Sequence, residues 1–251
     1  MTKILIFDIE NSPNISYTWG KYEQDVIDFK QEWFMLSFAY KWLGKKDTTH
    51  SYCLADFDKY KKDKTNDLDL VSILWSLLDK ADIVIGHNSD RFDIRKANAR
   101  FIAHGMNPPS PYKTIDTLKI AKKYFMLNSN KLSHLSEYLG LGSKVETGGF
   151  NLWLGCMAGD SKAWKKMVKY NKQDVVLTEK VYKKLLPWIT NHPNINILDE
   201  RTGACPNCAS KKIQKRGWSI TLLSKRQRFH CQSCGRWSAG KIEKIEGMEV
   251  R

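Results

Sequence analysis

The chain has 251 residues, of which 42% are hydrophobic, so it can form one sizeable domain with a real core and a small second domain. It carries 41 Lys and Arg against 27 Asp and Glu, a net charge of +14. Such an excess favours a polyanionic partner, with nucleic acid as the first candidate. A protein that is merely basic and soluble is the alternative reading of the charge alone.

No segment approaches the roughly 18 uninterrupted apolar residues that a membrane span needs, and the N-terminus has no signal-peptide pattern. Four of the six cysteines form two CxxC pairs, while Cys53 and Cys156 stand alone. This spacing argues against a framework of disulfides. We therefore expect a protein of the reducing cytoplasm with no membrane partner.

Apolar runs and helical periodicity predict strands first and then strands that alternate with helices. Strands are expected at 3–9, 33–43, 49–54 and 82–86, with a hairpin turn at 44–47 and a strand or turn around 114–116. Helices are expected at 67–80, 91–104, 131–139 and 161–186. This order is typical of an α/β fold, in which helices pack on the faces of a mixed sheet.

The composition changes after Trp188. Residues 190–202 are polar, contain Pro193 and show no sustained period, which predicts a linker. The linker would separate a domain of residues 1–189 from a tail of residues 203–251. The tail holds 11 basic and 3 acidic residues, a net charge of +8, so it carries more than half of the excess.

Two acids, Asp8 and Glu10, end the first apolar run, ILIFDIEN. Residues two apart on a strand point to the same face, so the two carboxylates repel each other unless a cation lies between them. A divalent metal is the natural partner. The alternative is an exposed strand end with both acids in water.

Two further acids stand at comparable places. Asp93 follows the fourth expected strand, after a loop that also holds His87 and Asn88, where α/β folds usually place their sites. An acid that simply suits a helix N-terminus is the alternative. Asp174 lies four residues after Tyr170 on the last long helix, so the two share a face. The alternative interpretation of Asp174 is an acid on the helix surface near lysines.

The motifs FDIE, HNSDRFD and YNKQDVV resemble, in order and spacing, the three exonuclease motifs of the DEDD superfamily of 3′-to-5′ exonucleases. The tyrosine four residues before the last acid resembles the motif of the tyrosine-bearing branch of this superfamily. The three motif sequences are most similar to those of its small YprB-like members. The resemblance covers residues 1–187. It implies an RNase H-like mixed sheet flanked by helices, with two Mg²⁺ or Mn²⁺ ions held by Asp8, Glu10, Asp93 and Asp174.

The resemblance also implies roles for other side chains. Tyr170 would orient the attacking water, which the two metals activate while they stabilise the leaving oxygen. Asn88 and His87 would shape the loop or touch the nucleotide, and His87 also has a purely structural reading. Asp116 is not expected to be a direct ligand. Aromatic residues in 14–34 could stack on terminal bases or pack in the core.

Two CxxC pairs in the tail, 22 residues apart, predict one structural zinc ion held by Cys205, Cys208, Cys231 and Cys234. The segment between them has seven basic residues, no acid and interleaved aromatics. Its candidate nucleic-acid contacts are Lys215, Arg216, Trp218, Arg226 and Arg228. The tail resembles the zinc ribbons of transposases and transcription factors. Docking to a protein, such as a replication or repair protein, is the alternative.

Together these patterns predict a two-metal 3′–5′ exonuclease that trims nucleic acid from single-stranded 3′ ends, with the zinc ribbon gripping the substrate. DNA is favoured over RNA, although neither the acids nor the ribbon reads the sugar. Two alternatives stay open. A structure-selective RNase H-like endonuclease or resolvase is disfavoured by Tyr170, and a non-catalytic nucleic-acid-binding module is disfavoured by the complete set of acids.

Overall fold

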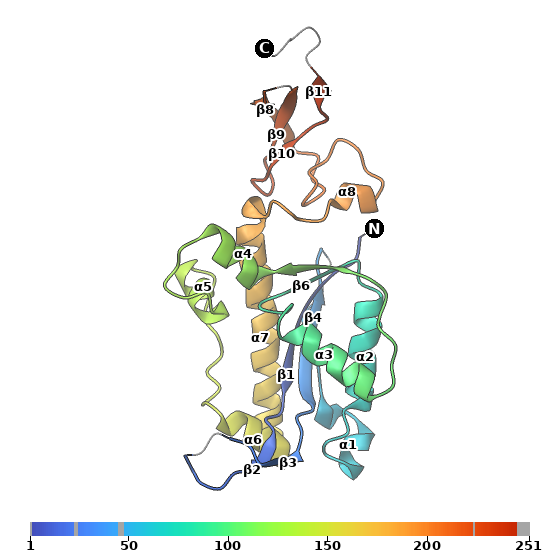
Figure 1. The fold of residues 1–251 in the computed structure, drawn as a ribbon, viewed down its shortest axis with the longest axis vertical. Helices are drawn as coiled ribbons and strands as arrows, with labels where there is room; N and C mark the ends of the chain where they lie inside the picture. Colours follow the sequence, from blue (N-terminus) through green and yellow to red (C-terminus); the bar gives the residue numbers. More distant parts are fainter. Residues whose placement is uncertain (1, 23–24, 45–47, 223, 245–251) are drawn as a thin grey trace. The chain divides into compact units, whose positions relative to one another are not determined.

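The structure is a computed structural model that describes residues 2–22, 25–44, 48–222 and 224–244. Residues 3–181 form one compact unit, and the described residues from 182 onward, with Thr2, form a second (Figure 1). None of the described helices has the length and apolar content that crossing a bilayer requires.

A five-stranded mixed sheet forms the centre of the first unit (Figure 1). Its strands are β1 (Ile4–Asn11), β4 (Met35–Trp42), β5 (His50–Cys53), β6 (Ile83–Gly86) and β7 (Lys113–Asp116). Their order across the sheet is β5–β4–β1–β6–β7. β4 pairs antiparallel with β1 and β5, whereas β6 pairs parallel with β1 and β7. The predicted α/β fold with a mixed sheet is therefore confirmed.

Helices lie on both sides of this sheet (Figure 1). They are α1 (Asp58–Lys62), α2 (Leu68–Asp79), α3 (Asp93–Ala103), α4 (Thr117–Tyr124), α5 (Leu132–Tyr138), α6 (Asn151–Ala158) and α7 (Ser161–Leu185), with 3₁₀ turns at Leu54–Asp56 and Leu186–Trp188. The sequence did not predict α1, α4 or α6. Each has eight residues or fewer, about two turns, which is too short for a clear helical period.

The alternation of β1 sets the two faces of the sheet. Leu5, Phe7 and Ile9 are almost completely buried in a core shared with α2 and α3. Successive strand residues point to opposite faces, so Asp8 and Glu10 lie on the other face. A hydrogen bond from α7 to the Asp8 side chain shows that this second face is the one that α7 covers.

Two segments differ from the prediction. Within 14–34 a small separate hairpin forms, made of β2 (Ile15–Tyr17) and β3 (Asp28–Gln31). Trp19 and Tyr22 in its turn are 86% and 89% exposed, whereas Phe34 is buried in the core. β4 and β5 pair as a hairpin, but residues 45–47 of its predicted turn lie outside the described residues.

The second unit is built on β9 (Ser224–Cys231). One edge of β9 pairs with β8 (Ile213–Ile220), and the other pairs with β10 (Trp237–Ala239) and β11 (Glu243–Lys244). The stretch predicted as a linker, 190–202, contains a short helix, α8 (Ile195–Leu198). The first amide of α8, on Ile195, donates to the carbonyl oxygen of Pro206 at 2.8 Å, so this stretch packs against the first cysteine pair.

A buried carboxylate joins three elements behind the sheet. Asp67 precedes α2 at the cap position and is completely buried, but its side chain does not cap the helix. It accepts hydrogen bonds from the Met35 amide at 2.8 Å and from two nitrogens of Arg100 at 2.6 and 2.7 Å, and it contacts His104 Nε2 at 2.6 Å. This network ties α2 and the first residue of β4 to α3.

Replacing Asp67 with alanine should strongly destabilise the protein. The change leaves the Arg100 guanidinium and the Met35 amide without their acceptor, and breaking a buried ion pair in this way costs about 3–5 kcal/mol of unfolding free energy. Urea unfolding followed by circular dichroism measures the loss. The control is Asp69→Ala, which removes an ion pair with Lys59 near the surface and should cost no more than about 1 kcal/mol. Equal losses in the two variants would contradict the importance of the network.

Candidate active site

Three carboxylates meet near the end of β1. Asp8 and Glu10 come from β1 and Asp174 from α7, and their carboxylate oxygens lie within 4.8 Å of one another. Strand alternation places the first two on one face, and α7 brings the third across it. The structure therefore brings together three of the four acids that the sequence singled out as metal ligands.

Asn171 aligns α7 with β1. It is completely buried, and its amide Nδ2 donates to Asp8 Oδ2 at 2.6 Å and to the Asp8 carbonyl at 3.2 Å. Its Oδ1 accepts from the Ser37 hydroxyl on β4 at 3.2 Å. Asn171 lies one turn before Asp174, so these bonds fix the register of the helix against the strand. The sequence motif contained this residue without indicating what it does.

Asp93 lies beside the three carboxylates but outside the group that they form. It is the first residue of α3, is 3% exposed, and accepts a hydrogen bond from the Ile9 amide at 3.1 Å through Oδ1. Its charge is nevertheless among those that raise the pKa of Asp8. Asp93 thus lies at the same end of β1 as the three carboxylates.

Burial raises the pKa of every acid here, and repulsion by neighbouring carboxylates raises it further for Asp8, Glu10 and Asp93. Burial is the largest cause for Asp8, followed by the charges of Asp93 and Glu10. Burial, with the charge of Asp174, raises the pKa of Glu10 to about 8. Burial raises the pKa of Asp93 to about 7, against the lowering effect of the Ile9 amide. The site is therefore more stable when protons or other cations neutralise the four carboxylates than when all four are charged and unpaired.

Lys144 supplies a cation that the sequence gave no reason to expect. Its ammonium forms an ion pair with Asp174 and donates to the Tyr170 hydroxyl at 3.3 Å. The residue lies in the irregular segment between α5 and α6, where Gly140, Gly142, Gly148 and Gly149 have positive φ. A lysine in a segment without periodicity carries no sequence signal, which explains why it was missed.

Asp174 leaves one oxygen available for a further cation. Its Oδ1 is shielded from solvent and has no hydrogen-bond partner among the described residues. An ionised oxygen buried in this way is costly unless a cation meets it. Three oxygen-bearing side chains that converge within ligand distance suit a hard divalent ion such as Mg²⁺ or Mn²⁺. The residues present therefore fit the divalent metal that the acid pattern predicted.

Tyr170 lies at the edge of the same group. Burial, and next the charge of Asp174, raise the pKa of its phenol above the usual range, so the hydroxyl stays protonated. Its ring packs edge-on against Trp153, with centroids 6.1 Å apart. The residue can thus offer a fixed hydroxyl to a molecule that lies near the carboxylates.

The loop after β6 is held from within the protein. His87 Nδ1 contacts the Thr117 hydroxyl at 2.9 Å and Nε2 contacts the Asn130 carbonyl at 3.0 Å, while burial lowers the pKa of His87 to about 4. Both ring nitrogens are thus engaged, which suits a loop-shaping role. A Cβ added to Gly86 would lie 2.4 Å from the Ser89 Cβ, so the turn requires glycine at this position.

Asp116 shapes the same loop from β7. Its carboxylate accepts from the Asn88 amide at 2.8 Å and caps α4 through the Leu118 amide at 3.0 Å. The bond to Asn88 supports that residue in a left-handed conformation, with φ of 65°. Asp116, like Asp93, is not among the described carboxylates that gather within 4.8 Å.

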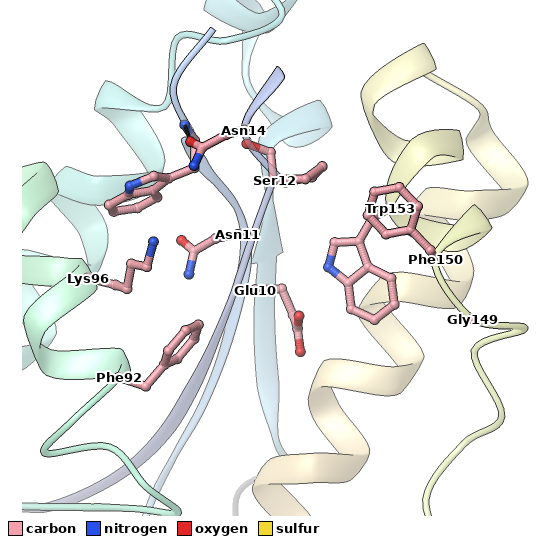
Figure 2. Close-up of a pocket in the computed structure, with 11 residues that line it drawn as sticks. Glu10, Asn11, Ser12, Asn14, Phe92, Lys96, Gly149, Phe150 and Trp153 are labelled. Carbon is pink, nitrogen blue, oxygen red and sulfur yellow. Dashed lines mark hydrogen bonds between the residues drawn. The ribbon is translucent and has the colours of Figure 1, made fainter. Parts of the chain in front are cut away.

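A pocket of about 640 Å³ opens beside Glu10 (Figure 2). Aromatic rings line much of it, from Trp33, Phe92, Phe150 and Trp153. Lys96 enters from α3, and its ammonium lies 3.6 Å from the centre of the Trp33 ring.

Asn11 also lines the pocket. It follows a bulge in the β1–β4 pairing, and both polar atoms of its side chain are shielded from solvent without a partner among the described residues. The flat aromatic faces of the pocket suit a nucleic-acid base, and its one cation suits a phosphate.

A sequence-family model described as the RNase H superfamily matches residues 5–186. The chain belongs to the RNase H superfamily. A solved structure with the same fold is the family B DNA polymerase from the hyperthermophilic archaeon Pyrobaculum calidifontis, with a TM-score of 0.52 and 17% identity over 75% of this chain. This chain spans a quarter of that polymerase. Comparison with curated proteins gives no match.

The second unit of this RNase H superfamily chain contains the four tail cysteines in one cluster. Their sulfurs lie within 4.8 Å of one another, with 3.6 Å between those of Cys205 and Cys234 and 3.7 Å between those of Cys208 and Cys231. A tetrahedral zinc ion with sulfurs at about 2.3 Å places them about 3.8 Å apart, so the cluster fits the predicted zinc ion. Left-handed residues, Ala209 and Gly235, follow the two pairs at equivalent positions.

The strand register divides the predicted nucleic-acid contacts of this unit between two faces. Lys225, Gln227 and Phe229 lie on one face of β9, because they are two residues apart. Trp218 pairs with Gln227 and Lys215 pairs with Phe229, so Trp218 and Lys215 lie on that same face. The ammonium of Lys225 lies 4.6 Å from the centre of the Trp218 ring.

Arg226 and Arg228 alternate to the opposite face of β9. There Arg228 lies 5.6 Å from the ring of Trp237, which stacks on His230. Trp237 is a candidate contact that sequence reasoning missed, because it follows the last cysteine pair rather than lying between the pairs.

Divalent cations should stabilise the protein more at high pH than at low pH. The raised pKa values mean that the folded protein holds these protons more tightly than the unfolded chain, whose acids titrate near pH 4. This stabilisation is complete below about pH 4 and is lost as pH rises through the folded values, about 7 for Asp93 and about 8 for Glu10. Above that range a bound cation replaces the lost protons.

The measurement is the melting temperature with and without Mn²⁺ at pH 5 and at pH 8.5. We expect the increase produced by Mn²⁺ to be larger at pH 8.5. The variant Asp8→Asn with Asp174→Asn, which removes two of the charges, should show little increase at either pH. An equal increase at both pH values in the unaltered protein would show that Mn²⁺ binds elsewhere.

Proposed function

We propose that the protein is a divalent-metal-dependent 3′–5′ exonuclease that hydrolyses phosphodiester bonds of nucleic acid, with DNA favoured over RNA. The observation that carries the proposal is the convergence of Asp8, Glu10 and Asp174 within 4.8 Å, beside Asp93 and Tyr170, in a chain of the RNase H superfamily. When bound there, two Mg²⁺ or Mn²⁺ ions supply an activated water and stabilise the leaving 3′-oxygen.

The side chains of the protein then have separate tasks. Asp8, Glu10, Asp93 and Asp174 hold the ions. Tyr170 keeps its proton and orients the water through its hydroxyl. Asn171 keeps the two halves of the ligand set in register through its bonds to Asp8.

The pocket beside Glu10 is the proposed place for the terminal nucleotide. A base fits between the aromatic rings, and Lys96 offers a charge to its phosphate. A pocket that takes one nucleotide at the metal site favours cleavage from an end. The endonuclease alternative instead needs a continuous strand to pass through the site.

The cysteine cluster and the basic hairpin are the proposed substrate grip. Arg226 and Arg228, with Trp237 and His230, give one face of β9 both charge and stacking surface. Docking to another protein is the competing role for this ribbon, because zinc ribbons serve both purposes.

The deciding experiment compares substrates labelled at the 5′ end: single-stranded DNA, duplex DNA and RNA of one sequence, together with a circular single strand. Linear strands should shorten from the 3′ end, one nucleotide at a time, and only when Mg²⁺ or Mn²⁺ is present. The circle should remain intact. Cutting of the circle would establish the endonuclease instead, and binding without any cutting would establish the non-catalytic module.

Loss of a carboxylate should abolish activity, whereas loss of the phenol should only weaken it. Asp8→Ala or Asp174→Ala removes a metal ligand, so we expect a fall of at least roughly 10³-fold in kcat/KM. Tyr170→Phe removes one positioning hydrogen bond and should cost roughly 10–10³-fold. Asp69→Ala, which changes a distant acid on α2, is the control. A Tyr170→Phe defect as deep as that of Asp174→Ala would contradict this division of tasks.

Neutralising the arginine face of the ribbon should weaken substrate binding without abolishing turnover. Arg226→Gln with Arg228→Gln removes two phosphate contacts, so the slope of log K against log salt should fall by about 1.5. Turnover at saturating substrate should persist, because the metal site is untouched. The matched control is Lys61→Gln with Lys62→Gln on α1, which removes the same charge. Equal affinity and slope in the ribbon variant and the unaltered protein would favour the docking role.

A further inference from the structure

Trp153 connects two side chains of the candidate active site that come from different elements. It is half-buried on α6 and lines the pocket together with Glu10 of β1. Its ring also packs edge-on against Tyr170 of α7, with the ring centroids 6.1 Å apart and the ring planes at 72°. Trp153 therefore lies against both the strand and the helix that supply the carboxylates.

The indole nitrogen of Trp153 faces the Glu10 carboxylate. Figure 2 shows this nitrogen on the edge of the ring that lies towards Glu10. Burial raises the pKa of Glu10, and Trp153 is among the groups that lower it, as a side-chain hydrogen-bond donor. The indole N–H of tryptophan can donate a hydrogen bond but cannot accept one. It therefore favours the ionised form of Glu10, which is the form that binds a metal.

The packing of α6 holds Trp153 in this position. Leu152 and Cys156 of the same helix are 5% and 0% exposed, so one side of α6 is anchored in the core. A Cβ added to Gly155 would lie 2.8 Å from the Cβ of Ala163 in α7, which is closer than such atoms pack in proteins. The backbone of α6 thus lies directly against α7 at Gly155. This close approach leaves little room for α6 to shift relative to the helix that carries Tyr170.

The carboxylates that neighbour Glu10 each have a donor of their own. The Asn171 amide donates to Asp8, and the Ile9 amide donates to Asp93. Carboxylates that hold metals are commonly oriented by such a hydrogen bond from a neighbouring group. Glutamate has one more rotatable bond than aspartate, so fixing its carboxylate costs more conformational entropy. A donor on a rigid helix that faces Glu10 meets this need.

We propose that Trp153 is a positioning residue of the candidate active site, whose indole N–H orients the Glu10 carboxylate and whose ring holds the Tyr170 phenol in place. The inference rests on the proposed function, because it gives Trp153 a task at the site where the divalent ions and the attacking water would lie. The competing role is that of an inert aromatic wall of the pocket.

The test compares Trp153→Phe with a matched control in the full chain. Phenylalanine keeps an aromatic ring in the pocket but has no N–H. The control is Trp75→Phe on α2, another half-buried tryptophan that packs against the same core. Its indole donates to the Asn107 carbonyl at 2.7 Å, away from the carboxylates. The measurements are Mn²⁺ affinity by isothermal titration calorimetry and hydrolysis of a 5′-labelled single-stranded 20-mer, with the melting temperature as a check of folding.

We expect Trp153→Phe to bind Mn²⁺ about tenfold more weakly and to lower kcat by about 10- to 100-fold, because losing a group that orients a metal ligand commonly costs this much. KM should change by no more than about twofold, since a residue that acts on the ligands and not on the bound strand affects kcat. Trp75→Phe should leave all three quantities unchanged. An inert wall predicts the same small effects for both variants.

The contact with Tyr170 is tested by a double-mutant cycle that combines Trp153→Leu with Tyr170→Phe. Leucine removes the ring as well as the N–H, so Trp153→Leu should lower kcat more than Trp153→Phe does. This extra loss should disappear when residue 170 is already phenylalanine, because no hydroxyl is left to hold in place. An extra loss that persists in the Tyr170→Phe background overturns the role of the ring.

The outcomes separate this inference from the proposed function. If the unaltered protein hydrolyses DNA, equal Mn²⁺ affinity and equal kcat in Trp153→Phe and Trp75→Phe overturn the inference and leave the nuclease standing. If the unaltered protein hydrolyses nothing, the proposed function fails and Mn²⁺ affinity alone decides. A loss of affinity confined to Trp153→Phe then supports the orientation of Glu10 by Trp153, and equal affinities overturn it.

Discussion

Negative charge crowded at one end of the sheet is the constraint on which the rest of the site depends. Several carboxylates in a half-buried space are stable only if something cationic or polar faces each of them. The protein meets part of this demand itself, through the Lys144 ammonium, the Asn171 amide and the Ile9 N–H. The remaining demand favours a bound cation, because one oxygen of Asp174 has no partner in the described chain.

The fold meets this constraint by fixing each acid from a different element. β1 sets two of them by strand alternation, α3 begins with the third, and α7 presents the fourth across the sheet. Only packing holds these elements at the required distances, so interactions away from the site matter to it. Asp67 shows this most directly: it touches no ligand, yet it ties the helix that begins with Asp93 to the strand that neighbours β1.

Much of this arrangement could be predicted from the sequence, because strand and helix periods report which residues share a face. Asp8 with Glu10, Tyr170 with Asp174, and the paired cysteines all follow from spacing within one element or one knuckle. Lys144 and the unpaired Asn11 could not be found in this way. Their positions depend on an irregular segment and on a strand bulge, and neither leaves a periodic pattern. The sequence indicated that Asp93 follows the strand at 82–86. The hydrogen bond that it accepts from the Ile9 amide could be found only in the structure, because the two residues are 84 apart in the sequence.

The glycine-flanked segment that carries Lys144 has a consequence for how tightly the proposed metal site can hold an ion. The ammonium and an incoming divalent ion neutralise the same carboxylate, so each weakens the hold of the other on Asp174 by an equal factor. The conformation of this segment, which fixes where the ammonium lies, is therefore a determinant of metal affinity at that site.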